Sequence, residues 1–128
     1  MYTILVVDDS DISRDKIMKF LDLDGFNTAG ACNGREGLKA FKTLVRVDLI
    51  IADINMPVMD GLTMIEEINQ ISDHPIPSLV ISSDASERQQ RRGRRIGVIG
   101  WILKPIDEKI VLDGVRQILQ KYNGEKSE

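Results

Sequence analysis

The stretch Ile4-Leu5-Val6-Val7-Asp8-Asp9-Ser10 places four consecutive apolar residues directly before two acidic ones. A short run of Ile, Leu and Val without polar alternation is typical of a strand buried on both faces, as the strands of a parallel sheet are. Similar runs occur later in the chain, at residues 49–52, 79–81 and 101–103. A weaker candidate strand at residues 28–31 lies between the turn signals Asp24-Gly25 and Asn33-Gly34, which favours a position at or near a sheet edge.

Segments of helical length separate the predicted strands, and three of them carry apolar residues at the spacing of one helix face. In the first helix these residues are Ile17, Phe20 and Leu21. In the third helix, which follows Asp60-Gly61, they are Leu62, Ile65 and Ile68. The fifth helix has Asp107 as its expected N-cap. Its apolar stripe is formed by Ile110, Val111, Val115, Ile118, Leu119 and Tyr122. A shorter second helix is expected over residues 33–44.

Five strands that alternate with five helices predict an α/β fold. Successive parallel strands need right-handed crossover connections, which place helices on both faces of the sheet. We therefore expect one five-stranded parallel sheet between two helical layers, a three-layer sandwich. In such sheets, ligands bind at the carboxyl ends of the strands, near the point where the strand order reverses.

The composition limits the class of protein. With 128 residues, of which 42% are apolar and 29% charged, the chain has the size and composition of one globular domain. We expect the domain to cover residues 2–122, and residues 123–128 to form a flexible tail. The net charge of −3 argues against direct nucleic-acid binding by the chain as a whole.

The sequence shows neither a secretion signal nor a membrane-spanning segment. The N-terminal apolar run is too short to cross a bilayer, and it has no basic region or cleavage site. Cys32 is the only cysteine, so an internal disulfide is excluded. These features predict a cytoplasmic protein without a membrane partner, in which Cys32 is a packed thiol.

Reactive side chains follow four of the predicted strands. Asp8 and Asp9 end the first strand, and Asp53 ends the third. Ser82 ends the fourth strand and Lys104 the fifth, so all these side chains should converge at one edge of the sheet. Three carboxylates in one crevice repel each other unless a cation neutralises them, and oxygen ligands of this kind suit Mg²⁺. The sequence therefore predicts a magnesium site.

Asp53 is the candidate nucleophile of this site. A carboxylate beside a metal ion can attack a phosphoryl group, since phosphoryl transfer depends mainly on in-line positioning and charge neutralisation. Lys104 could pair with one phosphoryl oxygen as a point charge, and the hydroxyl of Ser82 could donate a hydrogen bond to another.

In order and spacing, these segments resemble the receiver domain of two-component response regulators, the family of the CheY-type chemotaxis regulators. The matching segments are residues 4–10, 53–61, 82 and 101–105. The resemblance covers nearly the whole chain, and it implies a flavodoxin-like, CheY-like sheet with the strand order 2-1-3-4-5.

The resemblance also implies a role for each acidic residue. Asp53 would be the phosphoacceptor. Asp9 and Asp53 would give carboxylate ligands to Mg²⁺, and Asn55 would give its backbone carbonyl. Asp8 would act mainly through a metal-bound water.

A second group of residues would respond to phosphorylation, again by resemblance. Ser82 would move toward the phosphoryl group, Trp101 would change rotamer with it, and the peptide bond before Pro105 would be cis. Asn55 and Asp84 would flank the route of the attacking water. Because both are polar, we expect a comparatively short lifetime of the phosphorylated form.

The resemblance implies a signalling domain rather than an enzyme, one that catalyses only its own phosphorylation and dephosphorylation. The phosphodonor would be a sensor histidine kinase or a phosphotransfer protein. The face formed by the fourth helix, the fifth strand and the fifth helix would contact an output domain or a downstream protein. A homodimer formed on phosphorylation would use the same face.

Two other functions are weighed against this one. Asp9-Ser10-Asp11 resembles the nucleophile motif of haloacid-dehalogenase-like phosphatases, in which Asp9 would be phosphorylated, but the chain is too short for a cap domain. A binding module that works without phosphate would have lost acidic residues, and none is missing here.

The fourth predicted helix, within residues 86–96, has almost no apolar stripe and contains an internal glycine, Gly93. Glycine there costs about 1 kcal/mol relative to Ala, so the helix should be weakly anchored and easily shifted. It also carries a basic cluster of Arg91, Arg92, Arg94 and Arg95. Two interpretations stay open: a solvated charged face, or a surface that docks an acidic partner.

Overall fold

The computed structural model describes residues 1–124 and contains five strands that alternate with five helices. The strands are β1 (Thr3–Val7), β2 (Asn27–Ala31), β3 (Leu49–Ala52), β4 (Ser78–Ser82) and β5 (Gly100–Leu103). The helices are α1 (Asp11–Leu23), α2 (Gly34–Thr43), α3 (Gly61–Ile71), α4 (Glu87–Ile96) and α5 (Glu108–Gly124). The predicted α/β fold is confirmed.

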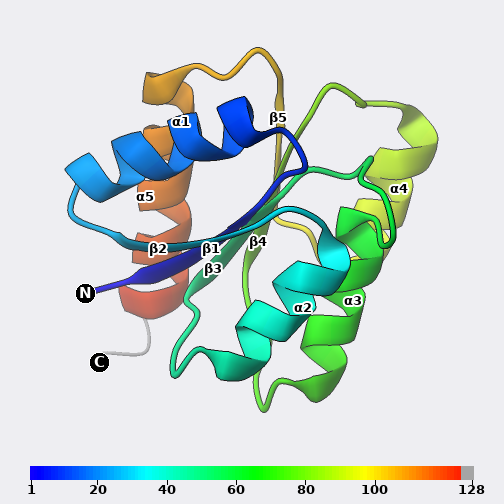
Figure 1. Cartoon of the computed structure of the whole chain (residues 1–128), viewed down its shortest axis with the longest axis horizontal. Coiled ribbons are helices and arrows are strands. Elements are labelled where there is room, and N and C mark those ends of the chain that lie inside the picture. The colour runs from blue at the N-terminus through cyan, green and yellow to red at the C-terminus, as the bar shows by residue number, and fades with distance from the viewer. Residues whose placement is uncertain (125–128) are drawn as a thin grey trace.

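The strands form one parallel sheet in the order β2-β1-β3-β4-β5, as the resemblance implied. Figure 1 shows this sheet between two helical layers, with α1 and α5 on one face and α2, α3 and α4 on the other. The strand order reverses between β1 and β3, where Val7 pairs with Ala52. The carboxyl ends of these two central strands are therefore neighbours, and the residues that follow them face the same crevice.

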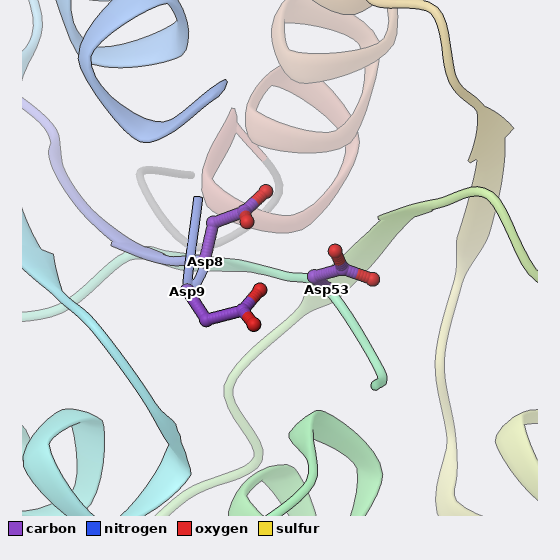
Figure 2. Close-up of side chains that lie close together, drawn as sticks. All are labelled: Asp8, Asp9 and Asp53. Carbon is purple, nitrogen blue, oxygen red and sulfur yellow. The ribbon is translucent and has the colours of Figure 1, made fainter. Parts of the chain in front are cut away.

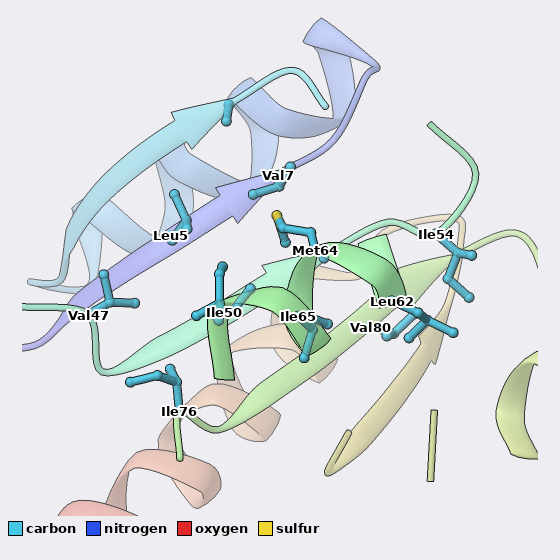
Figure 3. Close-up of a cluster of buried hydrophobic side chains, with 13 residues drawn as sticks. Leu5, Val7, Val47, Ile50, Ile54, Leu62, Met64, Ile65, Ile76 and Val80 are labelled. Carbon is cyan, nitrogen blue, oxygen red and sulfur yellow. The ribbon is translucent and has the colours of Figure 1, made fainter. Parts of the chain in front are cut away.

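Two apolar cores, one on each face, hold the layers together. Because successive side chains of a strand point to opposite faces, β1 sends Leu5 and Val7 into one core and Ile4 and Val6 into the other. Figure 3 shows the core on the α3 side of the sheet, with Leu62, Met64 and Ile65 of α3, and Ile68 of the same helix belongs to this core too. The α1 and α5 core is formed chiefly by Ile17, Phe20, Leu21, Val111, Val115 and Leu119 with the strands. This two-sided burial explains the uninterrupted apolar runs in the sequence.

Three expectations about the C-terminal third need correction. β5 is not a buried strand: it lies at the sheet edge, and Leu103 at its end is 54% exposed. On α5, Ile110 is 55% exposed, because the face turned to the sheet is the one that carries Val111, Val115 and Leu119. α5 also continues through Gly124, two residues into the expected tail, while residues 125–128 lie outside the described part of the chain.

Polar caps fix where the helices begin. The N-caps Ser10, Asn33, Asp60 and Ser86 each accept a hydrogen bond from the backbone nitrogen three residues further on. Asp107 makes the same contact with the Ile110 nitrogen at 3.1 Å, which confirms the cap predicted for α5. Four of these caps come within four residues of the end of the preceding strand, whereas Asp60 follows the longer loop after β3.

Cys32, which follows β2, is exposed rather than packed as expected. β2 is an edge strand, so it has a neighbouring strand on one side only. Within residues 1–124, none of the helices combines the length and the apolar character needed to cross a bilayer.

Candidate functional site

Three carboxylates converge at the carboxyl ends of β1 and β3. Figure 2 shows the side chains of Asp8, Asp9 and Asp53 close together at this edge of the sheet. One oxygen from each lies within 4.8 Å of the others, although Asp53 is more than forty positions away from Asp8 and Asp9 in sequence. Asp8 and Asp53 are buried and Asp9 is exposed, so the cluster opens to solvent on the Asp9 side.

Lys104, just beyond β5, contacts two of these carboxylates at once. Its Nζ lies 3.0 Å from Oδ2 of Asp8 and 3.0 Å from Oδ2 of Asp53. Burial raises the pKa of Asp8, and the Ser10 amide and Lys104 only partly offset it. For Lys104, burial works to lower the pKa, but the hydrogen bonds and charges of Asp8 and Asp53 outweigh it, so the pKa is raised and the ammonium form is favoured.

The backbone holds the two buried carboxylates in place. The amide of Ile54 donates to Oδ1 of Asp53 at 2.7 Å, and the amide of Ser10 donates to Oδ1 of Asp8 at 2.9 Å. Each residue therefore uses one oxygen for the backbone and the other for Lys104. Gly61, at the start of α3, lies directly against the backbone of Asp53. A Cβ at position 61 would collide with the carbonyl oxygen of Asp53, so only glycine allows the two segments to come this close.

A second set of contacts centres on Asp84, in the loop after β4. Its amide donates to Oγ of the buried Ser82 at 3.1 Å. Its carbonyl accepts from Nε1 of Trp101 at 3.1 Å, and its carboxylate accepts from Nδ2 of Asn55 at 3.4 Å. Asp84 thus connects Ser82 with Trp101, the two residues that are predicted to respond to phosphorylation.

Other predicted site features are also found near the acids. The peptide bond between Lys104 and Pro105 is cis, as the resemblance implied. Asn55, two residues after Asp53, is exposed in the loop between β3 and α3. The structure thus brings the strand-end residues of the sequence prediction together at one edge of the sheet.

A strained turn in the same loop was not predicted. Val58 has a φ of 72°, a conformation that is unfavourable for a β-branched residue. The amide of Met59 donates to the carbonyl of Pro57 at 2.8 Å, which closes a three-residue γ-turn around Val58. No local sequence signal indicates this turn, since glycine is the residue that most readily adopts a positive φ and position 58 is a valine.

The role of Arg92 was also not predicted. Instead of facing solvent with the rest of the basic cluster, its Nη2 donates to Thr63 Oγ1 at 2.8 Å and to the carboxylate of Asp60 at 3.2 and 3.3 Å. Asp60 is the N-cap of α3, so Arg92 connects α4 to the end of the loop that begins at Asp53. Arg91, Arg94 and Arg95 remain exposed.

The donor set suits a hard divalent cation. The cluster offers only carboxylate oxygens, the ligands that Mg²⁺ prefers, and no imidazole or thiolate. One lysine is shared by the two buried carboxylates, so three negative charges face one positive side chain. The residues present therefore fit Mg²⁺.

Proteins of known sequence are similar to this chain along most of its length. Residues 4–122 match the model of the response regulator receiver domain. The chemotaxis protein CheY of Treponema pallidum is 34% identical over 121 residues, which cover 93% of this chain and 83% of that protein. The probable transcriptional regulator ycf27 of Cyanidium caldarium is also 34% identical, but the match covers 92% of this chain and 46% of ycf27. The sensor histidine kinase CheAY of Helicobacter pylori matches over 98% of this chain and 16% of its own length.

Solved structures show the same fold. CheY4 of Vibrio cholerae superposes with a TM-score of 0.87 at 31% identity, covering 93% of this chain and 99% of that one. CheY in a CheX-CheY-BeF3-Mg²⁺ complex from Borrelia burgdorferi superposes with a TM-score of 0.85 at 28% identity, covering 92% and 89%. The family model, the sequence relatives and the fold agree: this chain belongs to the response regulator receiver domains, the CheY-like signalling modules of two-component systems.

Proposed function

We propose that this receiver domain accepts a phosphoryl group on Asp53 from the phosphohistidine of a sensor histidine kinase or a phosphotransfer protein, with Mg²⁺ as cofactor. The observation that carries the proposal is the position of the Lys104 ammonium, 3.0 Å from both Asp8 and Asp53 in a three-carboxylate cluster. A lysine placed in this way can contact a phosphoryl oxygen once the group is attached to its carboxylate neighbour.

In the proposed transfer, a carboxylate oxygen of Asp53 forms a bond to phosphorus. The bond between phosphorus and the donor imidazole nitrogen breaks, and the nitrogen keeps the electron pair. Oδ2 of Asp53 is the oxygen we assign to this attack, since it lies beside the Lys104 side chain that can contact the phosphoryl group, whereas Oδ1 accepts a hydrogen bond from the Ile54 backbone amide. In dephosphorylation, water attacks phosphorus and the bond between phosphorus and the Asp53 oxygen breaks. Inorganic phosphate leaves, and the Asp53 carboxylate is restored.

The cation site is assigned to the same residues as in the sequence prediction. Asp9 and Asp53 would bind Mg²⁺ through their carboxylates, Asn55 through its backbone carbonyl, and Asp8 through a water. When bound, Mg²⁺ supplies neutralisation of charge on the phosphoryl oxygens. Lys104 complements it by holding the buried carboxylates at a fixed distance from each other.

The conformational response is proposed to pass through Ser82 and Trp101. The phosphoryl group brings roughly −1.5 to −2 charge and three acceptor oxygens into the crevice. We expect the Ser82 hydroxyl to turn toward one of these oxygens, which breaks its contact with the Asp84 amide. The Asp84 loop, to which the Trp101 indole is bonded, then loses a fixed point, so the ring can turn into the space that Ser82 leaves.

The partner surface follows from the position of Trp101. β5 and its neighbours α4 and α5 form the face we propose for an output domain, a downstream protein or a phosphorylation-linked homodimer. Three apolar side chains support this choice, because Ile99, Leu103 and Ile110 are 36%, 54% and 55% exposed there. The chain has a single cysteine and therefore no internal disulfide, which supports a cytoplasmic location for the phosphoryl transfer.

Intact-mass measurement tests the phosphorylation directly. The protein is incubated with acetyl phosphate, with Mg²⁺ or with a chelator, as wild type and as Asp53→Asn. We expect one phosphoryl adduct on the wild type with Mg²⁺, and none with the chelator or on Asp53→Asn. Asp113→Asn, on the exposed side of α5, is the matched control and should be phosphorylated like the wild type.

Each other outcome has a distinct meaning. An adduct that persists on Asp53→Asn and disappears on Asp9→Asn would favour the phosphatase-like nucleophile at Asp9. The absence of any adduct on the wild type would favour a module that binds partners without phosphate. A phosphorylated form that persists for hours would contradict the short lifetime expected from Asn55 and Asp84.

A further inference from the structure

The glycine inside α4 lies directly against the ring of Trp101. Gly93 is one of only two buried residues of this helix, and a Cβ built on it would lie 2.7 Å from Cζ3 of Trp101. Bonded neighbours aside, carbon atoms do not approach this closely, so any side chain at position 93 would displace the ring or the helix. A glycine in a helix interior lowers helix stability. At position 93 it also leaves the space that the Trp101 ring occupies.

Trp101 is therefore held at two points. Its ring contacts Gly93, and its Nε1 donates to the carbonyl of Asp84 at 3.1 Å. The amide of Asp84 in turn donates to Oγ of Ser82 at 3.1 Å. The position of the ring is thus connected, through one loop residue, to the hydroxyl that we assign to the phosphoryl group.

We propose that Gly93 is a positioning residue that holds Trp101 against α4 and so sets the balance between the unphosphorylated and phosphorylated conformations. This inference rests on the proposed function, in which Trp101 leaves this position when Asp53 is phosphorylated. A methyl group at position 93 would clash only while the ring lies against α4. It would therefore destabilise the unphosphorylated conformation selectively and shift the population toward the other one.

The chain offers a matched control for the effect of alanine on a helix. Gly114, in α5, also lies in a helix interior, but a Cβ there would lie 3.7 Å from Cδ1 of Ile102, which is an ordinary contact. Replacement by alanine at such a position stabilises a protein, because alanine restricts the unfolded chain and favours the helix. Gly114→Ala therefore measures the gain without a clash, and Gly93→Ala measures the same gain with one.

The test uses thermal unfolding, Trp101 fluorescence and calorimetric titration with beryllofluoride in the presence of Mg²⁺. Beryllofluoride is a phosphoryl analogue that needs no kinase, and calorimetry measures its binding with or without a tryptophan in the protein. We expect Gly114→Ala to raise the Tm by about 3 °C. Gly93→Ala should leave the Tm unchanged or lower it, shift the Trp101 emission, and bind beryllofluoride about fivefold more tightly than the wild type. Trp101 is the only tryptophan, so the emission reports this ring alone.

A double-mutant cycle separates the ring contact from other effects of the methyl group. Phenylalanine at position 101 lacks the fused ring that reaches Gly93. In a Trp101→Phe background, Gly93→Ala should therefore raise the Tm as Gly114→Ala does, and should no longer tighten beryllofluoride binding. This rescue would not occur if the methyl group acted only on α4 itself.

Two results would overturn the proposal in different ways. If Gly93→Ala raises the Tm like Gly114→Ala and leaves emission and beryllofluoride affinity at wild-type values, Gly93 does not position Trp101. If the wild type does not respond to beryllofluoride at all, the proposed phosphoryl site fails, and with it the coupling of Gly93 to phosphorylation.

Discussion

α3 and α4 are neighbours on the same face of the sheet, yet they are attached to it by different means. α3 buries an apolar face of Leu62, Met64, Ile65 and Ile68. α4 buries only Gln89 and Gly93, and it is held by the Arg92 contacts with α3 and by the ring of Trp101. α3 is thus anchored by a large buried apolar area, and α4 by a few specific contacts.

This difference determines which helix can respond to the acid cluster. Apolar burial is non-directional and is lost only when a large area is exposed, so α3 keeps its position while loops nearby change. Hydrogen bonds depend steeply on distance and angle, so a small shift of the Asp84 loop can release α4. The weak anchoring predicted for α4 is therefore present in the structure, but it includes polar contacts that its sequence did not indicate.

The largest expected effect tests the apolar side of this comparison. Ile65→Ala removes a fully buried side chain of α3 and should lower the free energy of unfolding by about 3 kcal/mol. Ile96→Ala, at the end of α4 and only partly buried, should lower it by about 1 kcal/mol or less. Urea denaturation measures both. Equal losses would mean that α4 is anchored as firmly as α3.

Arg92→Gln tests the polar side. The Arg92 and Asp60 side chains are 33% and 34% exposed, so solvent screening limits the loss to about 1 kcal/mol. Amide hydrogen exchange should become faster in α4 and stay unchanged in α3, because α3 keeps its apolar face and its Asp60 cap. Arg95→Gln, on the exposed face, is the control. If exchange in α4 is the same in both variants, the contacts of Arg92 do not anchor the helix.

The exposed arginines of α4 should matter less for the domain itself. Replacement of Arg91, Arg94 and Arg95 by Gln should change the free energy of unfolding by less than about 1 kcal/mol, most of it from lost interaction with the helix dipole. The yield of the acetyl phosphate adduct, read by intact mass, should match the wild type. A lower yield would show that the cluster acts on the acid site rather than on a partner.

The smallest effect concerns the loop that leads into α4. The Ser86 amide, followed by the Ser86 and Asn55 side chains, lowers the pKa of Asp84 below its usual value of 3.8. Because the pKa is lower in the folded state, the contribution of Asp84 is fully present above pH 3.8 and is lost as the pH falls through the folded value. Carboxyl-carbon NMR should give a midpoint below 3.8 for Asp84. A midpoint at or above 3.8 would mean that these hydrogen bonds do not form in solution.

Much of the fold could be predicted because its strongest signals are local. Runs such as Ile4 to Val7 are apolar on both faces, and this pattern alone indicates a covered parallel sheet. The burial of β5 was mispredicted for a related reason: an edge strand and a central strand can carry the same apolar residues, and the order of strands is not visible in composition. The burial of Ile110 was also mispredicted, since an apolar residue at the start of a helix can lie beside the buried stripe without belonging to it.

The acid cluster was predictable because parallel topology alone brings Asp8, Asp9 and Asp53 to one edge. The shared contact of Lys104 with two of them depends on the three-dimensional packing of three strand ends, and the γ-turn at Val58 likewise has no sequence signal. Arg92 could not be separated from its arginine neighbours, because the choice depends on the position of Asp60 and Thr63 on another helix. The contact of Gly93 with Trp101 likewise joins two residues that no local pattern relates.

The exposed thiol of Cys32 makes this chain convenient for spectroscopy. It is the only cysteine, just as Trp101 is the only tryptophan, and the two residues follow or belong to the opposite edge strands β2 and β5. A maleimide dye attached to Cys32 can therefore serve as an energy-transfer acceptor for Trp101 without any substitution in the protein. Movement of the ring relative to the sheet could then be followed in real time, in the unaltered sequence, while the phosphodonor is added.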